Sequence, residues 1–435
     1  MSVRREWAGD RVHMKVLVMS LNYAPEQTGF APHAAAACEY MAARGHAVTV
    51  LTGFPFAPFW SRFPGYRGRL AMHEVMGGVD VIRVSHFLPR RPRSPAQRVL
   101  MEATFCMSAA VSALARIRQK WDVVLYIGAQ PGLAMLAKWL AKVHKIPYVV
   151  NINDLAAETA EDTGILQSRL ALGFLTAFEY SAYRGASAAM VLCDAFKDAL
   201  VAHGYPADQI HVVPSPVDTE SIRPVPREAG FRESMGLDAD DFAVVYSGSM
   251  GRKQDLFTVI EAARLVRDRF PSIKWVLVGD GELKEGIGAI VEEQDLKRQV
   301  IMLPLQSRSE LSRIFSSAEI LLLCQLKSVK DSVIPSKLLT YMAAGKPVIA
   351  AINPGSEAAK LLVRSGGGII VRPEDPQGLA EAVRTSLDRQ DDLRVMGMRN
   401  RQYACAEFDQ NKVLSRQVAL LQDVVDRHIS ERRGA

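Results

Sequence analysis

Short apolar runs alternate along the chain with longer segments whose apolar residues recur at helical spacing. The runs are rich in Val and Ile and are bounded by Gly, Pro, Asn or Asp, as is typical of strands buried in a parallel sheet. Such alternation predicts a doubly wound α/β domain. In the first half, the predicted strands are Lys15–Leu21, Ala47–Thr52, Val79–Val84, Val123–Ile127, Tyr148–Ile152, Ala188–Leu192 and Ile210–Val213, and the predicted helices are Ala31–Arg44, Pro95–Lys120, Gly132–His144, Gln167–Tyr183 and Asp194–His203.

The alternation stops at the proline-rich segment Ser215–Glu228 and then resumes, which predicts a linker between two domains. The second series predicts strands Ala243–Ser247, Lys274–Val278, Val300–Leu303, Ile320–Leu323, Pro347–Ala351 and Gly368–Val371, and helices Leu256–Arg269, Leu283–Gln294, Ser309–Ser316, Ser336–Ala344, Glu357–Ser365 and Pro376–Arg389. The last segment, Asn411–Arg432, has the pattern of an amphipathic helix. We therefore expect two Rossmann-like doubly wound domains, residues 14–218 and 219–405, that face a central cleft where ligands bind.

Composition narrows the possible classes of protein. The chain has 435 residues, of which 49% are hydrophobic and 23% charged, so we expect a folded globular protein with more than one domain. The net charge of +6 is too small for a nucleic-acid-binding arm. The five cysteines form no C-x-x-C pair, no apolar run reaches 18 residues, and the first 13 residues lack a signal-like apolar stretch. These features predict a cytoplasmic protein without disulfides or a zinc site.

Two glycine-containing loops follow predicted strands of the second domain. In YSGSMGRKQD (Tyr246–Asp255), glycines let backbone N–H groups approach a phosphate, and Arg252 and Lys253 add charge. A tight turn with solvated basic residues is the alternative. In VLVGDGE, Gly279 and Gly281 could begin a G-x-G-x-x-G pattern, but Lys284 stands where its third glycine would be. This departure counts against a dehydrogenase and favours a simple turn.

A third segment, PSKLLTYMAAGKP, begins a predicted helix whose first turn carries Ser336 and Lys337. A helix N-terminus directed at the cleft could bind a diphosphate, and a well-capped scaffold helix is the equal alternative.

The first domain offers fewer candidates. The loop NYAPEQTGFAPH contains Thr28 and Gly29, whose N–H groups could face a phosphate, and His33, a possible polar contact. The segment 151–163 carries four carboxylates after a buried strand, namely Asp154, Glu158, Glu161 and Asp162. Carboxylates in this position suit contacts with a base, sugar hydroxyls or a metal, whereas a solvated acidic helix start is the competing interpretation.

Basic residues flank the apolar stretch Ala103–Ala115: Arg90, Arg91, Arg93 and Arg98 precede it, and Arg116, Arg118 and Lys120 follow it. Such a helix suits the surface of an anionic membrane, or it is a core helix with solvated ends.

In order and spacing, these motifs resemble those of glycosyltransferase family 4, the retaining nucleotide-sugar transferases of the GT-B fold. The resemblance extends from Met14 to about Leu421. The combination of NYAPEQTG with PSKLLTYMAAGKP looks most like the bacterial colanic-acid and O-antigen transferases that move fucose-type sugars. The motifs that carry it are KVLVMSLNYAPEQTG, VVPSPVDTESIRP, YSGSMGRKQD, VLVGDGE, PSKLLTYMAAGKPVIA and GGGIIVRPEDPQGLAEAV.

The resemblance implies a role for each matching residue. Lys253, with Arg252, would stabilise the leaving diphosphate of the donor. The other donor contacts would come from Gly29, Ser249, Gly251, Gly279, Asp280, Gly281, Ser336, Lys337, Leu338 and Thr340. On the acceptor side we expect Thr28, His33 and Glu158, with Asp154 as a catalytic or acceptor contact. The final helix, within residues 406–435, would cross back to the first domain.

The chain also departs from the family pattern. Ser332 and Thr340 stand where two glutamates are common, so ribose recognition must be rearranged, with Asp331 a substitute. Asn153 stands where a histidine usually precedes the aspartate, and Ser215-Pro216 is a structural variation near the linker.

The implied reaction passes a sugar from a nucleoside diphosphate to a glycan acceptor, lipid-linked or an oligosaccharide, in bacterial surface polysaccharide biosynthesis. No D-x-D-like clamp follows a strand, so we expect neither a metal nor a cofactor. The enzyme would work in the cytoplasm, peripherally on the inner face of the membrane. A GT-B nucleotide-sugar epimerase and a catalytically silent nucleotide-sugar-binding subunit are the alternatives.

Overall fold

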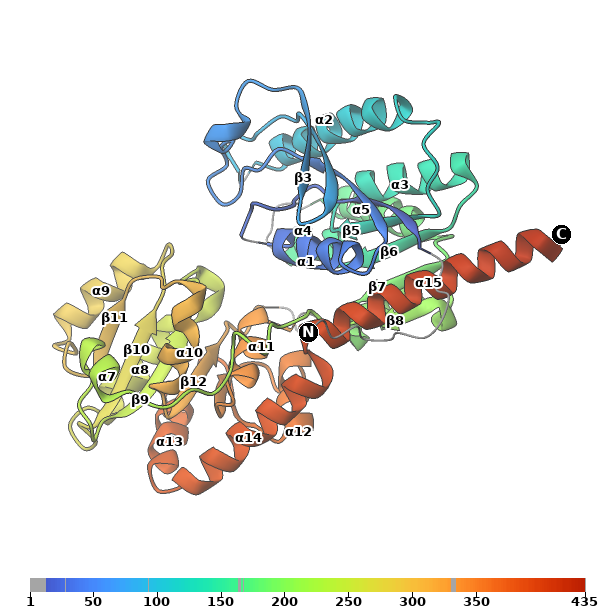
Figure 1. Cartoon of the computed structure of the whole chain (residues 1–435). Coiled ribbons are helices and arrows are strands. Elements are labelled where there is room, and N and C mark those ends of the chain that lie inside the picture. The colour runs from blue at the N-terminus through green and yellow to red at the C-terminus, as the bar shows by residue number, and fades with distance from the viewer. Residues whose placement is uncertain are drawn as a thin grey trace, which may run out of the picture. The chain divides into compact units, whose positions relative to one another are not determined.

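Two compact units, each built around one sheet, make up the computed structural model of the chain (Figure 1). The structure describes residues 13–27, 29–92, 94–162, 166, 168–329 and 334–434. The first unit runs to Val213 and also takes in the residues from Leu414 on, whereas Pro214–Val413 form the second. The predicted fold class, with two parallel-sheet α/β domains, is thus confirmed.

The sheet of the first unit has eight strands in the order β3-β4-β2-β1-β5-β6-β7-β8. Their bounds are β1 (Lys15–Met19), β2 (Ala47–Gly53), β3 (Ala71–Met76), β4 (Val79–Val84), β5 (Val123–Gly128), β6 (Tyr148–Ile152), β7 (Ala188–Val191) and β8 (Ile210–Val212). The strands pair in parallel except that β3 runs antiparallel to β4 at the edge. The central strands β1 and β5 are almost wholly buried, which explains their continuous apolar sequence.

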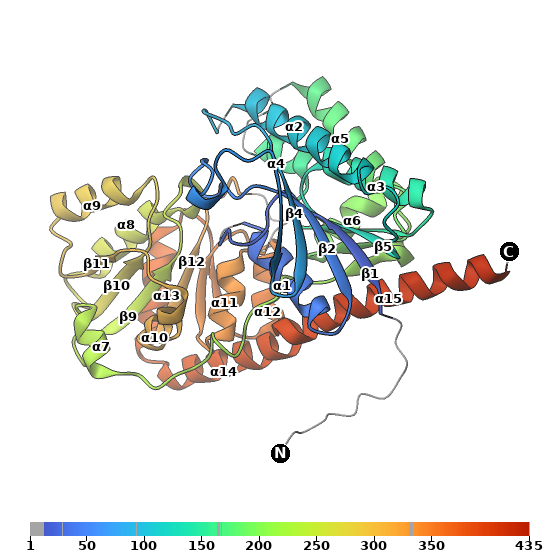
Figure 2. The ribbon, with the colours of Figure 1, turned by 45° about the horizontal axis from the view of Figure 1, so that its top comes forward.

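Helices lie on both faces of this sheet, as in a doubly wound fold. Their bounds are α1 (Ala31–Ala42), α2 (Pro95–Leu114), α3 (Pro131–His144), α4 (Ala156–Asp162), α5 (Arg169–Tyr183) and α6 (Asp194–Ala202), with short 3₁₀ turns η1 (Pro64–Tyr66) and η2 (Ala207–Gln209). Helices α2, α3 and α5 pack side by side in one layer (Figure 2).

The second unit has a six-stranded, fully parallel sheet in the order β11-β10-β9-β12-β13-β14. The strands are β9 (Phe242–Ser247), β10 (Ile273–Val278), β11 (Val300–Leu303), β12 (Ile320–Cys324), β13 (Val348–Ala351) and β14 (Gly368–Val371). The other elements are α7 (Ala229–Ser234), η3 (Arg252–Gln254), α8 (Leu256–Val266), α9 (Lys284–Glu293), η4 (Arg308–Glu310), α10 (Leu311–Ser316), α11 (Ser336–Ala343), α12 (Glu357–Ser365), α13 (Pro376–Leu387), α14 (Gln390–Glu407) and α15 (Gln410–Gly434), which continues into the first unit.

Alternate residues of β9 point into separate cores on the two faces of this sheet. Ala243 and Val245 belong to one apolar cluster, whereas Phe242, Val244 and Tyr246 belong to the other. Two covered faces make a three-layer sandwich, so polar groups of the strands gather at the sheet edges.

The structure differs from the sequence-based prediction in several elements. Strand β3 was not predicted, because its half-exposed edge position gives no apolar run. Helix α14 was missed because its sequence is mostly polar, and α2 ends at Leu114 rather than at Lys120. The proline-rich segment is irregular, as expected, but the Arg401 guanidinium holds it against the second unit by donating to the carbonyls of Thr219 and Ile222 (2.9 Å each).

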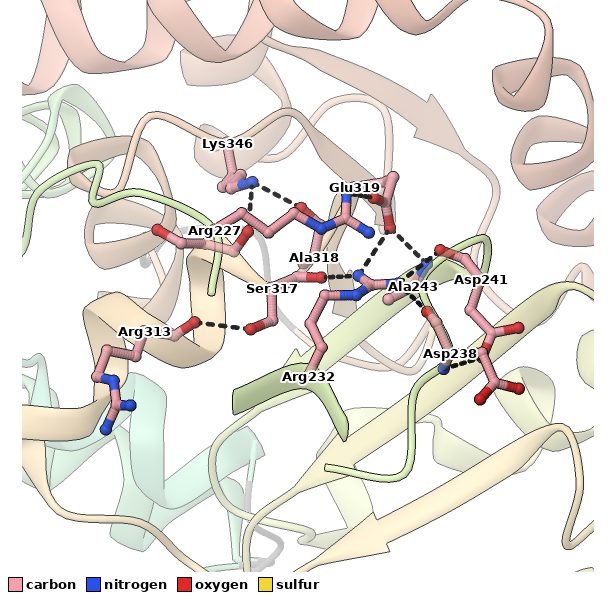
Figure 3. Close-up of polar contacts among 11 residues, drawn as sticks. Arg227, Arg232, Asp238, Asp241, Ala243, Arg313, Ser317, Ala318, Glu319 and Lys346 are labelled. Carbon is pink, nitrogen blue, oxygen red and sulfur yellow. Dashed lines mark hydrogen bonds and ion pairs between the residues drawn. The ribbon is translucent and has the colours of Figure 1, made fainter. Parts of the chain in front are cut away.

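A cluster of charged side chains holds the amino ends of the strands of the second sheet (Figure 3). Glu319 directly precedes β12, and its carboxylate pairs with Arg227 and lies 3.6 Å from the buried Arg232. Its Oε2 also accepts a hydrogen bond from the N–H of Ala243 in β9 (2.6 Å). These carboxylate and guanidinium groups bond to one another and to the backbone, so we assign the cluster a structural role. The carboxyl ends of the strands remain as the place for a ligand.

Candidate functional site

The loops that follow β9 and β10 interlock at the carboxyl edge of the second sheet. The N–H of Gly248 donates to the carbonyl of Val278 (2.9 Å), and the N–H of Met250 donates to that of Asp280 (2.8 Å). The carbonyl of Met250 in turn accepts from the N–H of Leu283 at the start of α9 (2.9 Å). The two glycine motifs, which are separate in the sequence, therefore form one structure.

Two glycines make this close approach possible. A Cβ at Gly279 would lie 1.9 Å from the Gly248 carbonyl oxygen, and one at Gly281 would lie 2.7 Å from that of Met250. Both glycines also have positive φ angles, +157° and +151°. A side chain at either position would force the backbones apart, so the fold of the loops itself requires glycine at both positions.

Lys337, in the first turn of α11, extends over the first of these loops. Its Nζ donates to Tyr246 Oη (2.7 Å) and to Gln254 Oε1 (2.8 Å), and it lies 4.1 Å from the centre of the Tyr246 ring. A Cβ at Gly248 would lie 3.2 Å from Nζ. Burial lowers the pKa of the Lys337 ammonium to about 8, because removal from water disfavours the charged form. No carboxylate among the described residues pairs with this ammonium, which is held by neutral oxygens and an aromatic ring.

The two cations of η3, Arg252 and Lys253, differ in their contacts. Arg252 is exposed and pairs with Glu282 (Nη2–Oε1, 2.7 Å). The side chain of Lys253 is exposed, while its carbonyl accepts from the N–H of Leu326 (3.0 Å) and so fixes the backbone beneath it. The charge of Arg252 is thus compensated by a carboxylate, whereas no ion pair of Lys253 is found among the described residues.

The remaining predicted donor contacts fall into exposed and buried groups. Ser249, Asp280 and Ser336 are exposed, and Gly251 is partly exposed in the same loop as Ser249. The carboxylate of Asp280 accepts from the N–H of Gly281 (2.8 Å), so it also shapes its own loop.

Two predicted contacts on α11 have local structural partners. The Leu338 side chain is fully buried in the apolar core, so only its backbone could meet a ligand. Thr340 Oγ1 donates back to the carbonyl of Ser336 (3.0 Å), a bond within the helix.

Sequence reasoning missed Tyr246 and Gln254, which hold the Lys337 ammonium, and Tyr341, which holds the end of β9. Tyr246 and Tyr341 are both buried, and Tyr341 Oη bonds both the N–H and the carbonyl of Ser247 at the end of β9 (2.9 and 3.0 Å). Tyr246 Oη donates to the Ser249 carbonyl. A tyrosine near the end of a buried strand was the indication in the sequence, since its hydroxyl needs a polar partner.

The predicted residues of the first unit lie on α1, α4 and the loops before them. Gly29 adopts φ +63°, with no atom within 4 Å of the position that a Cβ would occupy, and His33 is partly buried in the first turn of α1. Asp154 Oδ1 accepts from the N–H of Leu155 (3.0 Å) and from Thr159 Oγ1 (2.8 Å), and Glu158 is partly buried in α4. The predicted residues that lie outside the described part of the chain are Thr28, Arg93, Asp331 and Ser332.

Glu179 of α5 is a buried carboxylate that was not predicted. It accepts from the N–H groups of Ala156 and Ala157 (2.7 and 2.9 Å) and from Tyr183 Oη (3.1 Å). Burial raises its pKa, while these donors oppose the rise. Glu179 thus fixes the start of α4, next to Asp154.

Among the residues that the structure describes, no three His, Cys, Asp or Glu side chains are grouped to hold a metal ion. Within the same residues, no helix is long and apolar enough to cross a bilayer.

Comparison with known proteins matches both halves of the chain to glycosyltransferase domains. Residues 28–216 match the Glycosyl transferase 4-like domain, and residues 229–403 match the Glycosyl transferases group 1 domain. A protein of Escherichia coli K12 named for colanic acid biosynthesis glycosyl transfer is 28% identical over 382 residues, which are 86% of this chain and 92% of that protein. The amylovoran biosynthesis glycosyltransferase of Erwinia amylovora is 23% identical over 51% of this chain and 52% of its own length.

Solved structures share the fold. Sucrose-phosphate synthase from Thermosynechococcus elongatus superposes with a TM-score of 0.71 at 17% identity, covering 95% of this chain and all of that one. An Anabaena protein, HepE, in complex with UDP gives a TM-score of 0.68 at 15% identity over 94% of this chain and all of its own. WaaG, a glycosyltransferase of lipopolysaccharide biosynthesis, gives 0.66 at 18% identity over 94% and 99%. The chain has one α/β sheet in each unit, and its two halves match these two domains. It therefore belongs to the family of GT-B glycosyltransferases, with a 4-like domain followed by a group 1 domain.

Proposed function

We propose that this glycosyltransferase moves a sugar from a nucleoside diphosphate to an acceptor hydroxyl with retention of configuration, in the assembly of a bacterial surface polysaccharide. The observation that carries the donor half of the proposal is the position of Lys337, an ammonium held over Gly248 where two glycine loops interlock. The relatives named for colanic acid and amylovoran biosynthesis support the polysaccharide half.

The chemistry needs positive charge where the diphosphate leaves. Cleavage of the bond to the sugar places negative charge on the departing phosphate, and fixed cations that face this charge lower the barrier by several kcal/mol. Lys253 is exposed beside the loop, Arg252 is close by, and Lys337 approaches from α11. Because no carboxylate in the described part of the chain pairs with Lys337, a phosphate oxygen can complete the coordination of its ammonium.

The donor is a nucleoside-diphosphate sugar in this proposal. The HepE structures contain UDP or UDP-glucose, which supports a donor of this class. Ser249, Gly251, Gly279, Asp280 and Gly281 would face the nucleotide through backbone and side-chain polar groups. Ser336 and Thr340 would face the phosphate and sugar.

On the acceptor side, we assign the catalytic or acceptor contact to Asp154. Its carboxylate is oriented by the N–H of Leu155 and by Thr159, and Glu158 lies in the same short helix. His33, in the first turn of α1, would complete the acceptor side.

The acceptor is lipid-linked in this proposal, and α2 supports a membrane location. Its outward stripe consists of Leu100, Met107, Val111 and Leu114, each about half or more exposed. The spacings of seven, four and three residues keep these side chains on one face of the helix. Exposed arginines flank the stripe, a pattern that fits the interface of an anionic bilayer.

Two measurements test the proposal. A thermal-shift screen with UDP-, GDP- and dTDP-sugars should show stabilisation by one donor class, since ligand binding to the folded state raises its stability. With that donor, product should form only when an acceptor glycan is added. Product without acceptor would instead indicate an epimerase or a hydrolase, and binding without any turnover would indicate a silent subunit.

A further inference from the structure

A cavity of about 490 Å³ lies at one edge of the second sheet, between β14, α13 and α14. Strand β14 ends the strand order, and β12 and β13 separate it from β9, whose following loop belongs to the candidate donor site. None of the candidate donor residues is among those that line the cavity. The cavity is therefore distinct from the donor site, and its volume suits a drug-sized ligand or a few amino-acid residues.

Apolar side chains from all three elements form much of the cavity wall. They are Ile369, Val371, Ala382, Leu393 and Met396. Val371 and Leu393 belong to the core cluster on this face of the sheet, and the other three pack against that cluster. The cavity thus lies at the margin of the core, and its apolar surface favours the binding of an apolar group.

The backbone of β14 also borders the cavity. Ile369, Ile370 and Val371 all line it, although successive side chains of a strand point to opposite faces. The Ile370 side chain packs against the core on the other face of the sheet, whereas that of Ile369 packs on this face. The cavity must therefore run along the free edge of the strand, where backbone polar groups are accessible.

The hydrogen bonds between β13 and β14 show which backbone groups this edge offers. The N–H of Val348 donates to the carbonyl of Gly367 (3.1 Å). Further along both strands, the N–H of Ile352 donates to the carbonyl of Val371 (3.1 Å). Because backbone groups alternate in direction along a strand, the N–H and carbonyl of Ile370 point away from β13. No hydrogen bond from outside the sheet is found to either group among the described residues, so Ile370 leaves one donor and one acceptor at the cavity.

The cavity also carries one uncompensated cation. Arg372 directly follows β14 and is exposed, and in the described part of the chain no ion pair of its guanidinium is found. The three carboxylates of the lining already accept hydrogen bonds (2.8 Å each): Asp375 from the N–H of Gly378, Glu381 from Arg384 and Asp392 from Arg389. The end of the cavity at Arg372 therefore suits an anion.

These features are complementary to the end of an extended peptide. A peptide strand can accept from the N–H of Ile370 and donate to its carbonyl, as in strand addition to a sheet edge. One apolar side chain would enter the cavity, and the terminal carboxylate would meet the Arg372 guanidinium. The aliphatic chain of a lipid would cover the Ile370 groups without pairing them, which would weaken binding by about ten-fold for each group.

We propose that the cavity between β14, α13 and α14 binds the apolar carboxyl-terminal segment of a partner protein, which pairs with β14 as an added strand. With its carboxylate at Arg372, the added strand runs parallel to β14, as β14 itself runs parallel to β13. This interaction is separate from sugar transfer and would attach the enzyme to another protein.

Fluorescence polarisation with the full chain tests the site. The probes are fluorescein-labelled hexapeptides with free carboxyl termini, whose last three positions are varied among apolar and polar residues. We expect peptides with apolar ends to bind. The affinity of the best peptide should fall about ten-fold when its carboxylate is amidated, and equally in Arg372→Gln, since each change removes one charge-assisted contact. Ala382→Phe should abolish binding, because the ring takes the space of the peptide side chain.

Methylation of single amide nitrogens in the best peptide tests its pairing with β14. Only alternate N–H groups of an added strand face the sheet. N-methylation of the amide that faces Ile370 should weaken binding about ten-fold, whereas N-methylation of the neighbouring amide should leave the affinity nearly unchanged. An equal loss at both positions would exclude strand pairing.

Matched controls separate the site from general effects of charge and size. Arg269→Gln removes another exposed arginine of the second unit, and Ala289→Phe adds a ring at an exposed position of α9. Neither should change the affinity for the peptides. The melting temperature of each variant, and its rise with a bound nucleotide-sugar donor, show that the second unit is folded.

Three results would overturn the inference: no binding by any peptide, unchanged affinity in folded Arg372→Gln and Ala382→Phe, or binding of decanoate without binding of any peptide. The last result would assign the cavity to a lipid-like anion. None of these results bears on the transferase function, which the donor-induced stabilisation tests independently.

Discussion

Lys337 gives a prediction that links pH, stability and donor binding. Its ammonium has a pKa of about 8 in the folded chain, against an ordinary value of 10.5, because it is partly withdrawn from water. A pKa shift of this size corresponds to a loss of folding stability of at most about 3 kcal/mol, and partial exposure of the Lys337 side chain reduces this loss to about 1–2 kcal/mol. This is the cost of holding the charged form in the ligand-free fold.

The sign follows from the proton balance. Below pH 8 the lysine is charged in both the folded and the unfolded chain, so the whole cost is present. Between about pH 8 and pH 10.5 only the unfolded chain keeps the proton, and the cost is relieved as pH rises. Lys337→Met should therefore stabilise the ligand-free protein at pH 7, by about 1 kcal/mol, and the gain should shrink towards pH 10.

Donor binding should change in the opposite direction. The variant lacks the ammonium that meets the diphosphate, so the affinity for the nucleoside diphosphate should fall about ten-fold at pH 7. Wild-type affinity should itself decline above pH 8, as the lysine loses its proton. Urea unfolding and calorimetric titration, each at about pH 7 and about pH 9.5, measure both effects.

Lys346 provides the matched control. Burial lowers the pKa of the Lys346 ammonium to about 8 as well. Lys346 lies near the charged cluster around Glu319 at the amino ends of the strands, and its Nζ donates to the carbonyls of Ser316 and Ala318 (3.2 and 2.6 Å) (Figure 3). Lys346→Met should alter stability and leave nucleotide affinity unchanged. Equal nucleotide affinities of wild type and Lys337→Met at pH 7, or an equal loss in Lys346→Met, would show that Lys337 does not meet the diphosphate.

Three further predictions concern the loops, the exposed cation and α2. Gly279→Ala should destabilise the second unit by about 3 kcal/mol or more in urea unfolding, because its Cβ would meet the backbone at 1.9 Å, whereas Gly286→Ala, with open space in α9, should be neutral or slightly stabilising. Lys253→Ala should lower kcat for sugar transfer about 100-fold without changing the melting temperature, since the side chain is exposed; unchanged turnover would remove it from catalysis. Val111→Glu should reduce sedimentation with phosphatidylglycerol vesicles at low salt several-fold, and sedimentation equal to wild type would count against α2 as the membrane surface.

The sequence was sufficient to predict the two parallel sheets, because their strands are buried on both faces and read as continuous apolar runs. Strand β3 and helix α14 lack such patterns: one is a half-exposed edge, and the other is stabilised by its neighbours more than by its own amphipathicity. Local patterns carry information only where one side of an element is consistently buried.

The sequence indicated the separate loops of the candidate site, but not how these loops and their side chains come together in space. The glycines of both loops stood out in the sequence, yet only the structure shows that Gly279 packs on Gly248. The contact between Lys337 and Tyr246 joins residues 91 positions apart, and no local pattern encodes it. Leu338, expected near the donor, belongs to the core because the α11 helix turns its side chain inward.

Hydrogen–deuterium exchange with a bound donor would locate the donor site on the chain. The donor that gives the largest thermal shift among UDP-, GDP- and dTDP-glucose is added to the full chain, and amide exchange is mapped. We expect protection of residues 246–255, 279–284 and 334–340, which form the interlocked loops and the start of α11. Protection elsewhere, with these three segments unchanged, would be incompatible with a donor site at the carboxyl edge of the second sheet.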